Sequence, residues 1–133
     1  MKIVGATEYA VVLYRDKLPK FNNIGKDGKN HMIFNWFEWK RDTSKEYAKI
    51  HPTQKPVNVL KQLIKIFTDE GDVVIDPVAG SASTLRACAE LNRNCYGFEI
   101  KKDFYNKAKE KMISDDILNG IMEDGQLTLE AIM

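Results

Sequence analysis

Two acidic residues stand where a ligand site is expected, because each follows a short apolar run. Asp76 follows Val73–Ile75, and Glu99 follows Cys95–Phe98. Small residues fill the turn after Asp76, so the backbone there can approach a ligand closely. Glu99 lies about twenty residues after Gly80 in that turn, the offset at which an acid accepts hydrogen bonds from ribose hydroxyls. The pattern therefore predicts half of a nucleoside-binding pocket.

The bland alternative is a tight turn followed by a solvated acid. The segment His51–Pro56, which reads HPTQKP and precedes the turn, favours the functional interpretation. The turn itself is not GxGxxG, so a dinucleotide is not favoured. His51 is equally compatible with capping a helix or contacting the ligand, and His31 is expected in an exposed loop. No nucleophile triad, metal-ligand cluster or phosphate-binding loop accompanies these residues, so no metal site is expected.

The elements that must hold these acids follow from apolar periodicity. Helices are predicted where apolar residues recur at helical spacing, namely at Val57, Leu60, Leu63, Ile64 and Phe67, at Leu85, Cys88 and Leu91, and at Phe104, Ala108 and Met112. Pro56 suits the first helical position, with Thr53 or Gln54 near the cap. The apolar runs before Asp76 and Glu99 predict buried parallel strands joined by a right-handed crossover. The fold class is therefore α/β, with a partial Rossmann-like parallel sheet and flanking helices.

The flanks are less regular. Glu8–Tyr14 is β-branched and aromatic and predicts a strand, whereas residues 15–46 have no clean period and predict a long loop. Within that loop, Trp36 and Trp39 are expected to pack onto the core, and stacking on nucleic-acid bases is the alternative. Near the end of the chain, a short helix is expected over residues 117–122.

Length and charge suggest one domain of uneven character. The 133 residues predict a single unit with a strand and a basic, aromatic loop over 1–50, a cofactor-binding core over 51–114 and an acidic tail over 115–133. Net charge is only +1, but residues 15–41 hold seven Lys and Arg against three Asp and Glu. A basic segment can meet phosphates, but a solvated loop is the favoured explanation when the charge is taken alone.

The cellular compartment is inferred from cysteine usage and from apolar run length. Cys88 and Cys95 do not have metal-ligand spacing, and we expect two buried free thiols in a reducing cytosol. Apolar runs of membrane length and signal-peptide patterns are not found, so a cytoplasmic location and no membrane partner are expected.

Taken in order, His51–Pro56, Asp76–Thr84 and Gly97–Ile100 resemble the cofactor-binding motifs of DNA amino-methyltransferases. These enzymes use S-adenosylmethionine to methylate adenine N6 or cytosine N4. The motif order is similar to the permuted group, in which the catalytic half precedes the cofactor half. The resemblance implies that Thr53 and Lys55 build the methionine end of the pocket, that Asp76 faces the methionine amino group and that Glu99 holds the ribose.

The same resemblance implies the full set of cofactor-binding residues, which are Thr53, Lys55, Asp76, Pro77, Gly80, Ser81 and Glu99. Gly80 and Ser81 would line the pocket floor. The turn departs from the family pattern: Val78 replaces a phenylalanine that packs beside the cofactor, Ala82 a glycine and Ser83 a threonine. The Ala82 methyl is expected to crowd the cofactor or to strain the turn, and cofactor affinity should suffer.

The catalytic motif of that family is not found in this chain. The family uses Asp, Asn or Ser followed by Pro-Pro and an aromatic residue, whereas the prolines here, Pro19, Pro52, Pro56 and Pro77, are all separate. The sequence therefore predicts no catalytic residues and the C-terminal, cofactor-binding part of a DNA methyltransferase, inactive alone. DNA and either a split-enzyme partner or a second copy are the expected partners. The alternative is a degenerate, non-catalytic remnant that serves as a binding or interaction module.

Overall fold

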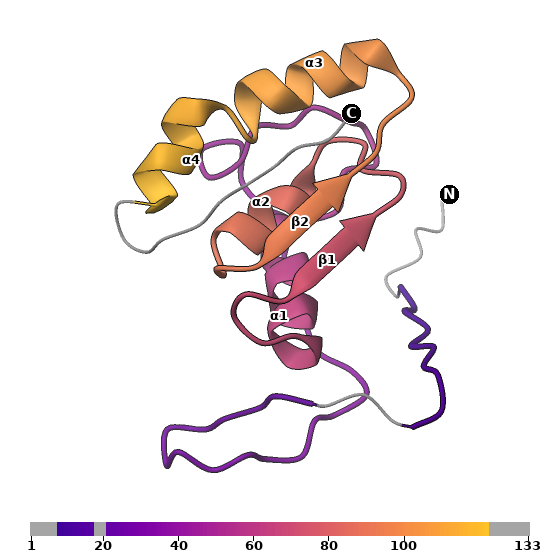
Figure 1. Cartoon of the computed structure of the whole chain (residues 1–133), viewed down its shortest axis with the longest axis vertical. Coiled ribbons are helices and arrows are strands. Elements are labelled where there is room, and N and C mark those ends of the chain that lie inside the picture. The colour runs from indigo at the N-terminus through magenta and orange to yellow at the C-terminus, as the bar shows by residue number, and fades with distance from the viewer. Residues whose placement is uncertain (1–7, 18–20, 123–133) are drawn as a thin grey trace, which may run out of the picture.

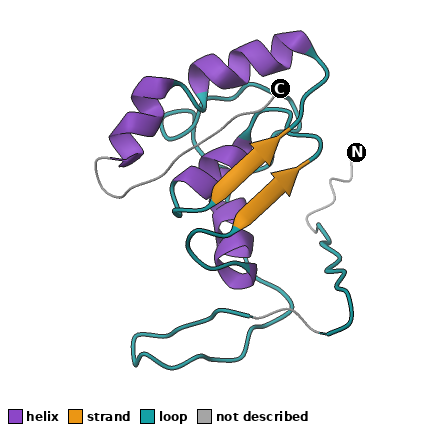
Figure 2. Cartoon of the chain, in the orientation of Figure 1, coloured by secondary structure: helices purple, strands orange, loops and turns teal. Residues whose placement is uncertain are grey.

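Helices and strands of the described residues begin at Val57 and continue to Met122. The computed structural model describes residues 8–17 and 21–122, and within them the elements are α1 (Val57–Phe67), β1 (Val73–Asp76), α2 (Ser83–Ala89), β2 (Asn94–Gly97), α3 (Lys102–Lys111) and α4 (Asp115–Met122) (Figure 1). The described residues before α1, 8–17 and 21–56, form no helix and no named strand (Figure 2). Among the helices described, none combines the length and the apolar character that crossing a membrane requires.

The two strands form a parallel sheet connected through α2, as the sequence predicted. Val74 pairs with Cys95 and Ile75 with Tyr96. Paired residues of neighbouring strands share a face of the sheet, so these two pairs point to opposite faces. The face of Val74 and Cys95 is covered by α2, and α1 packs against α2 (Figure 1).

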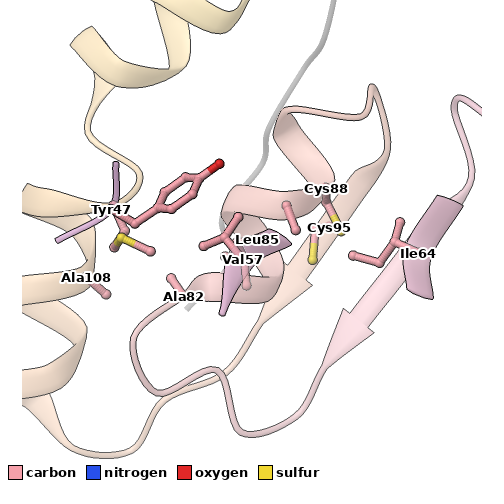
Figure 3. Close-up of a cluster of buried hydrophobic side chains, with 10 residues drawn as sticks. Tyr47, Val57, Ile64, Ala82, Leu85, Cys88, Cys95 and Ala108 are labelled. Atoms are coloured by element: carbon pink, nitrogen blue, oxygen red, sulfur yellow. The ribbon is translucent and has the colours of Figure 1, made fainter. Parts of the chain in front are cut away.

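The core lies between that covered face and the helices (Figure 3). Its buried members are Tyr47, Val57, Ile64, Ala82, Leu85, Ala87, Cys88, Cys95, Ala108 and Met112. Cys88 and Cys95 are buried free thiols, as predicted. Gly97 is required by this packing, because a Cβ there would lie 2.5 Å from Cδ1 of Leu85. The residue at the end of β2 therefore lets α2 sit close to the sheet.

The start of α1 differs from the prediction. Pro56 is the residue before the helix, and its own side chain makes no capping hydrogen bond. The carboxylate of Asp42, fifteen residues upstream, accepts the backbone N–H of Val57. Pro56 is therefore the N-cap and not the first helical residue as predicted, and Thr53 and Gln54 lie just before it. A distant acid satisfies the orphan N–H and also meets the positive end of the helix dipole.

The strand predicted over Glu8–Tyr14 is also wrong. These residues are loop, and Tyr9 and Leu13 are 91% and 87% exposed. Strand propensity measures how well a side chain fits a half-buried pleated surface, and it is not realised without a partner. No described strand pairs with this segment.

The packing predicted for the tryptophans is not observed either. Trp36 is 68% exposed, and Trp39 is also exposed. Tyr47 is the residue of the upstream loop that enters the core, at a position where α1, α2 and α3 converge. The long loop itself is confirmed, with one isolated bridge between Ile24 and Asn30.

The prediction that β1 is buried is correct for one of its faces only. Val73 and Ile75 are 56% and 63% exposed, although both strand runs were predicted to be fully buried. No described segment covers their face. The helix predicted around Phe104 is confirmed as α3, and the short C-terminal helix as α4. The remainder of the predicted acidic tail, residues 123–133, lies outside the described residues.

Candidate functional site

The candidate site forms at the carboxyl ends of β1 and β2. Asp76 is the last residue of β1 and pairs with Gly97, the last residue of β2. In an open parallel sheet, this edge is where ligands bind. Oδ1 of Asp76 accepts the backbone N–H of Val78 at 3.0 Å, which starts the turn. Among the described residues nothing hydrogen-bonds to Oδ2, so that oxygen can accept a ligand N–H.

Glu99 crosses from the end of β2 to the turn after β1. Its Oε2 accepts the backbone N–H of Gly80 at 2.9 Å, across nineteen residues of sequence. Its Oε1 accepts the N–H of Lys101 at 2.7 Å, just before α3 begins. The carboxylate is thus held at both oxygens. Each carboxylate oxygen has a second lone pair, so the group can still accept hydroxyl donors.

The turn between β1 and α2 relies on left-handed backbone. Gly80 has φ +55° and Ala82 has φ +59°. At Gly80 an added Cβ would meet nothing closer than the carbonyl oxygen of Val78 at 4.0 Å, so the backbone there is open. Ala82 bears the strain predicted from its sequence position, because an alanine disfavours this conformation. Its methyl group, however, belongs to the buried core cluster and not to the open side of the turn.

The side chain of Ser81 also faces the protein interior. It is buried, and its Oγ lies 3.0 Å from Oγ of Ser83. Pro77 and Val78 are exposed beside the turn. Of the predicted residues, the structure therefore brings Asp76, Gly80 and Glu99 to one edge of the sheet.

The HPTQKP loop is braced by its own side chains. Gln54 accepts the N–H of Ile50 at 2.9 Å and donates to the carbonyl of Ala48 at 2.9 Å. Nδ1 of His51 lies 2.9 Å from the hydroxyl of Thr53. The hydrogen bonds therefore give His51, Thr53 and Gln54 a local structural role that the loop sequence alone did not reveal.

One contact of this loop reaches α3, the helix that follows Glu99. The ring of His51 packs edge-on against Phe104 of α3, with centroids 4.6 Å apart. Lys55 instead forms an exposed ion pair with Glu8 at 2.7 Å. In the described part of the chain, neither Thr53 nor Lys55 hydrogen-bonds to the turn or to Glu99. The loop is thus placed beside α3, but the predicted roles of its two residues remain predictions.

A second acid, Glu90, organises the helices behind the sheet. Its carboxylate accepts from Lys61 of α1 at 2.6 Å, from Arg86 at 2.6 Å and from the hydroxyl of Tyr47 at 2.9 Å. Burial by itself would raise the pKa of Glu90, but these hydrogen bonds outweigh it and hold the pKa below its usual value. Burial and the same carboxylate raise the pKa of Tyr47. Sequence reasoning missed this group, because its members are far apart in the chain.

The buried thiols are chemically quiet. A hydrogen bond with Cys88 and burial raise the pKa of the Cys95 thiol, so the thiolate is disfavoured. Among the described residues, no group of three or more His, Cys, Asp and Glu could hold a metal ion. The chemistry of the site therefore rests on the acids and on the backbone at the strand ends.

A turn and an acid at adjacent parallel strand ends are the arrangement found in nucleotide-binding α/β folds, and comparison with known proteins gives the family of this chain. The N6/N4 methylase family model, described as DNA methylase, matches residues 6–110. The chain therefore belongs to the N6/N4 DNA methylase family, which confirms the resemblance seen in its motifs.

Individual relatives each match about half of the chain. Type II methyltransferase M.HpaI of Haemophilus parainfluenzae is 40% identical over 67 residues, which are 50% of this chain and 21% of that protein. Type II methyltransferase M.HindIII of Haemophilus influenzae is 45% identical over 62 residues, 47% of this chain and 20% of that protein. The crystal structure of the M1.HpyAVI–SAM complex aligns at 42% identity and a TM-score of 0.44, covering 45% of this chain and 30% of that one. The chain thus spans about a fifth of the length of these two curated relatives.

Proposed function

We propose that this chain is the cofactor-binding part of a DNA methyltransferase that acts on adenine N6 or cytosine N4. Family membership supports the reaction class. The observation that carries the proposal is the 2.9 Å hydrogen bond from Gly80 N–H to Glu99, which joins the turn of one strand to the acid of the next. On this proposal, residues 51–114 are the cofactor-binding core, with the segments before and after it serving as its flanks.

The residues at the strand ends fit S-adenosylmethionine. Glu99 presents carboxylate lone pairs to two ribose hydroxyls while its position is held by backbone N–H groups. Asp76 offers Oδ2 as an anion for the methionine ammonium group. The open backbone at Gly80 and the inward methyl of Ala82 leave the turn unobstructed. Thr53, Lys55, Pro77 and Ser81 complete the proposed set from the loop and the turn.

Bound S-adenosylmethionine supplies the activated methyl group. The residues of this chain bind and orient, because the sequence has no Pro-Pro motif to hold an exocyclic amine or to stack on a flipped base. Methyl transfer therefore requires the catalytic part of such an enzyme in addition to these 133 residues. The exposed face of Val73 and Ile75 is a surface that this part can cover, and the unpaired edges of the described two-stranded sheet are where it can add strands.

A non-catalytic remnant is the second candidate, favoured by the strain at Ala82 where the family pattern has glycine. Cofactor binding separates the two. Calorimetry with S-adenosylmethionine should give measurable heat with the wild-type chain. Glu99→Ala should weaken binding about 10- to 150-fold, because charge-assisted hydrogen bonds are worth about 1.5–3 kcal/mol each.

Glu110→Ala is the matched control, since Glu110 is an exposed acid on α3 away from the strand ends. Circular dichroism should confirm that both variants fold, and Glu99→Gln provides a milder replacement. Equal affinity in all proteins would remove Glu99 from the site. Absence of heat with the wild type would favour the remnant. Incubation of the chain alone with labelled cofactor and mixed-sequence DNA should give no incorporation above background.

A further inference from the structure

Residues 32–41 form an exposed aromatic and basic segment that the folded core does not use. Met32, Phe34 and Trp36 are 88%, 76% and 68% exposed. Large apolar side chains gathered on a surface mark an interaction site more often than single exposed residues do. Because the core is already filled without them, these side chains are available to a partner.

The start of the segment is held by the preceding hairpin, because Nδ2 of Asn23 donates to the carbonyl of Met32 at 2.9 Å. That hairpin is docked on α1, since the N–H of Asn22 donates to the carbonyl of Ile66 at 2.7 Å and Phe21 packs edge-on against Phe67 at 5.4 Å between centroids. These contacts lie at the C-terminal end of α1. After the segment, Asp42 caps the N-terminal end of the same helix.

The two attachment points lie at opposite ends of α1, and an 11-residue helix is about 16 Å long. Residues 32–41 therefore run between two fixed positions about that far apart. The hairpin that precedes the segment is closed by the Ile24–Asn30 bridge and is the purple loop at the bottom of Figure 1. Because the segment is already fixed on both sides, it loses less conformational entropy on binding a partner than a flexible tail would lose.

The charges on the segment point to a polyanion. Lys40 and Arg41 are exposed, and no ion pair engages them within the described residues. The segment contains one acid, the exposed Glu38, so its own balance is one positive charge. The acids beside it are partly committed, since Asp42 caps α1 and Asp27 lies 2.9 Å from Nε2 of His31. That hydrogen bond lowers the pKa of Asp27 and ties up its carboxylate. Adjacent cations and exposed aromatic faces together are the pattern of nucleic-acid binding, whereas protein interfaces deplete lysine.

We propose that residues 32–41 bind DNA, with Lys40 and Arg41 on phosphates and Phe34 and Trp36 against bases or sugars. The inference rests on the proposed function, because DNA is the substrate there. It goes further by giving this chain its own DNA-contacting surface, separate from the strand ends that would hold the cofactor. A loop that is only solvated has no reason to be fixed on both sides while it exposes three large apolar side chains.

The chain carries its own probe for the test, because both of its tryptophans, Trp36 and Trp39, lie in the segment. A fluorescein-labelled 24-bp mixed-sequence duplex should quench or shift tryptophan emission as it binds, while its anisotropy rises. The double variant Lys40→Gln/Arg41→Gln should bind about tenfold more weakly at low salt. Its salt slope should fall by about 1.8, because each phosphate contact contributes about 0.9.

Trp36→Ala should weaken binding of one labelled 24-nucleotide strand of the probe about 5- to 150-fold, the range for loss of one stacking platform, and binding of the duplex less, because paired bases are already stacked. The control for charge is Lys107→Gln/Lys109→Gln, which removes two exposed lysines from α3, and the control for aromatic exposure is Tyr9→Ala. Both controls should bind the duplex like the wild type. All variants should bind S-adenosylmethionine normally.

The outcomes separate this inference from the proposed function. Loss of DNA binding confined to the segment variants, with cofactor binding intact, supports it. Equal DNA binding by all variants, or loss in the α3 control alone, overturns it. A wild type that binds cofactor but no duplex overturns it while the cofactor proposal stands. Tryptophan emission that responds to protein concentration and not to DNA would identify the segment as a protein-contact surface and also overturn it.

Discussion

The two faces of the β1–β2 sheet differ although the strands are four residues each. On one face Val74 and Cys95 pack under α2, inside the core cluster (Figure 3). On the other face Val73 and Ile75 are more than half exposed. The apolar side chains therefore suit a sheet buried on both sides, whereas the described residues cover only one side.

The difference indicates where the rest of a methylase would lie. Apolar residues on both faces are typical of parallel strands between two layers of helices. Beyond the edge of β1 that faces away from β2, Figure 1 shows the extended residues 8–17, which are exposed and pair with no described strand. The open face, the open edge and this unpaired segment fit the proposal that a catalytic part completes the unit.

The largest predicted effect contrasts the two faces directly. Leu85→Ala on the covered side should lower the free energy of unfolding by about 2–5 kcal/mol, because it leaves a cavity against Gly97 and the core. Ile75→Ala on the open face should cost about 1 kcal/mol or less, since its side chain is 63% exposed. Urea denaturation followed by circular dichroism measures both.

If Leu85→Ala proves too unstable to analyse, Leu85→Val gives a smaller step on the same side. A loss at Ile75 as large as that at Leu85 would contradict the comparison. It would mean that the open face is covered in solution, and the dependence of the unfolding midpoint on protein concentration would then identify a second copy as the cover.

A smaller effect concerns the polar side of the covered layer. Glu90→Gln keeps the side-chain shape but weakens the bonds from Lys61, Arg86 and Tyr47, and should cost about 1.5–3 kcal/mol at pH 7. The pKa of Glu90 is lowered in the folded chain, so its contribution is present above the unfolded value near 4.5. That contribution is lost as pH falls through the folded pKa.

The stability difference between wild type and Glu90→Gln should therefore shrink as the pH is lowered from 7 to below about 4. Denaturation curves at several pH values measure this difference. Glu110→Gln is the control, because the exposed Glu110 should show little difference at any pH. A gap between wild type and Glu90→Gln that stays constant with pH would mean that the Glu90 charge adds nothing to folding.

Local periodicity explains which parts of the fold were predictable. The helices α1, α2 and α3 and both strands follow from apolar spacing. The contact between Gly80 and Glu99 follows from the rule that parallel strands end at one edge. These features depend on residues within one element or within one strand–helix–strand unit, so the sequence contains the whole signal.

Features that depend on distant partners were not predictable. The cap of α1 comes from Asp42, and Glu90 collects donors from three separate segments. The Glu8–Tyr14 segment has strand propensity but no described partner, and the tryptophans have apolar area but no place in the core. At Ala82, sequence correctly indicated strain, but only the structure shows that the methyl faces the core.

The smallest predicted effect on folding tests what the open face is for. The double variant Val73→Thr/Ile75→Thr keeps β-branched side chains, so strand propensity changes little. Because both residues are exposed, the free energy of unfolding of the isolated chain should change by about 0.5 kcal/mol or less. Association should change more, because an apolar face and an unpaired edge favour pairing with other chains.

Sedimentation across a concentration series should show the wild type associating and the double variant remaining monomeric to higher concentration. Ile24→Thr is the control, since Ile24 is 71% exposed but lies in the hairpin and not on the sheet. It should associate like the wild type. If the wild type is monomeric at every concentration, self-pairing is excluded as the cover. Addition of a separately expressed catalytic part of an N6/N4 methylase then tests the remaining partner, which should bind the wild type and not the double variant.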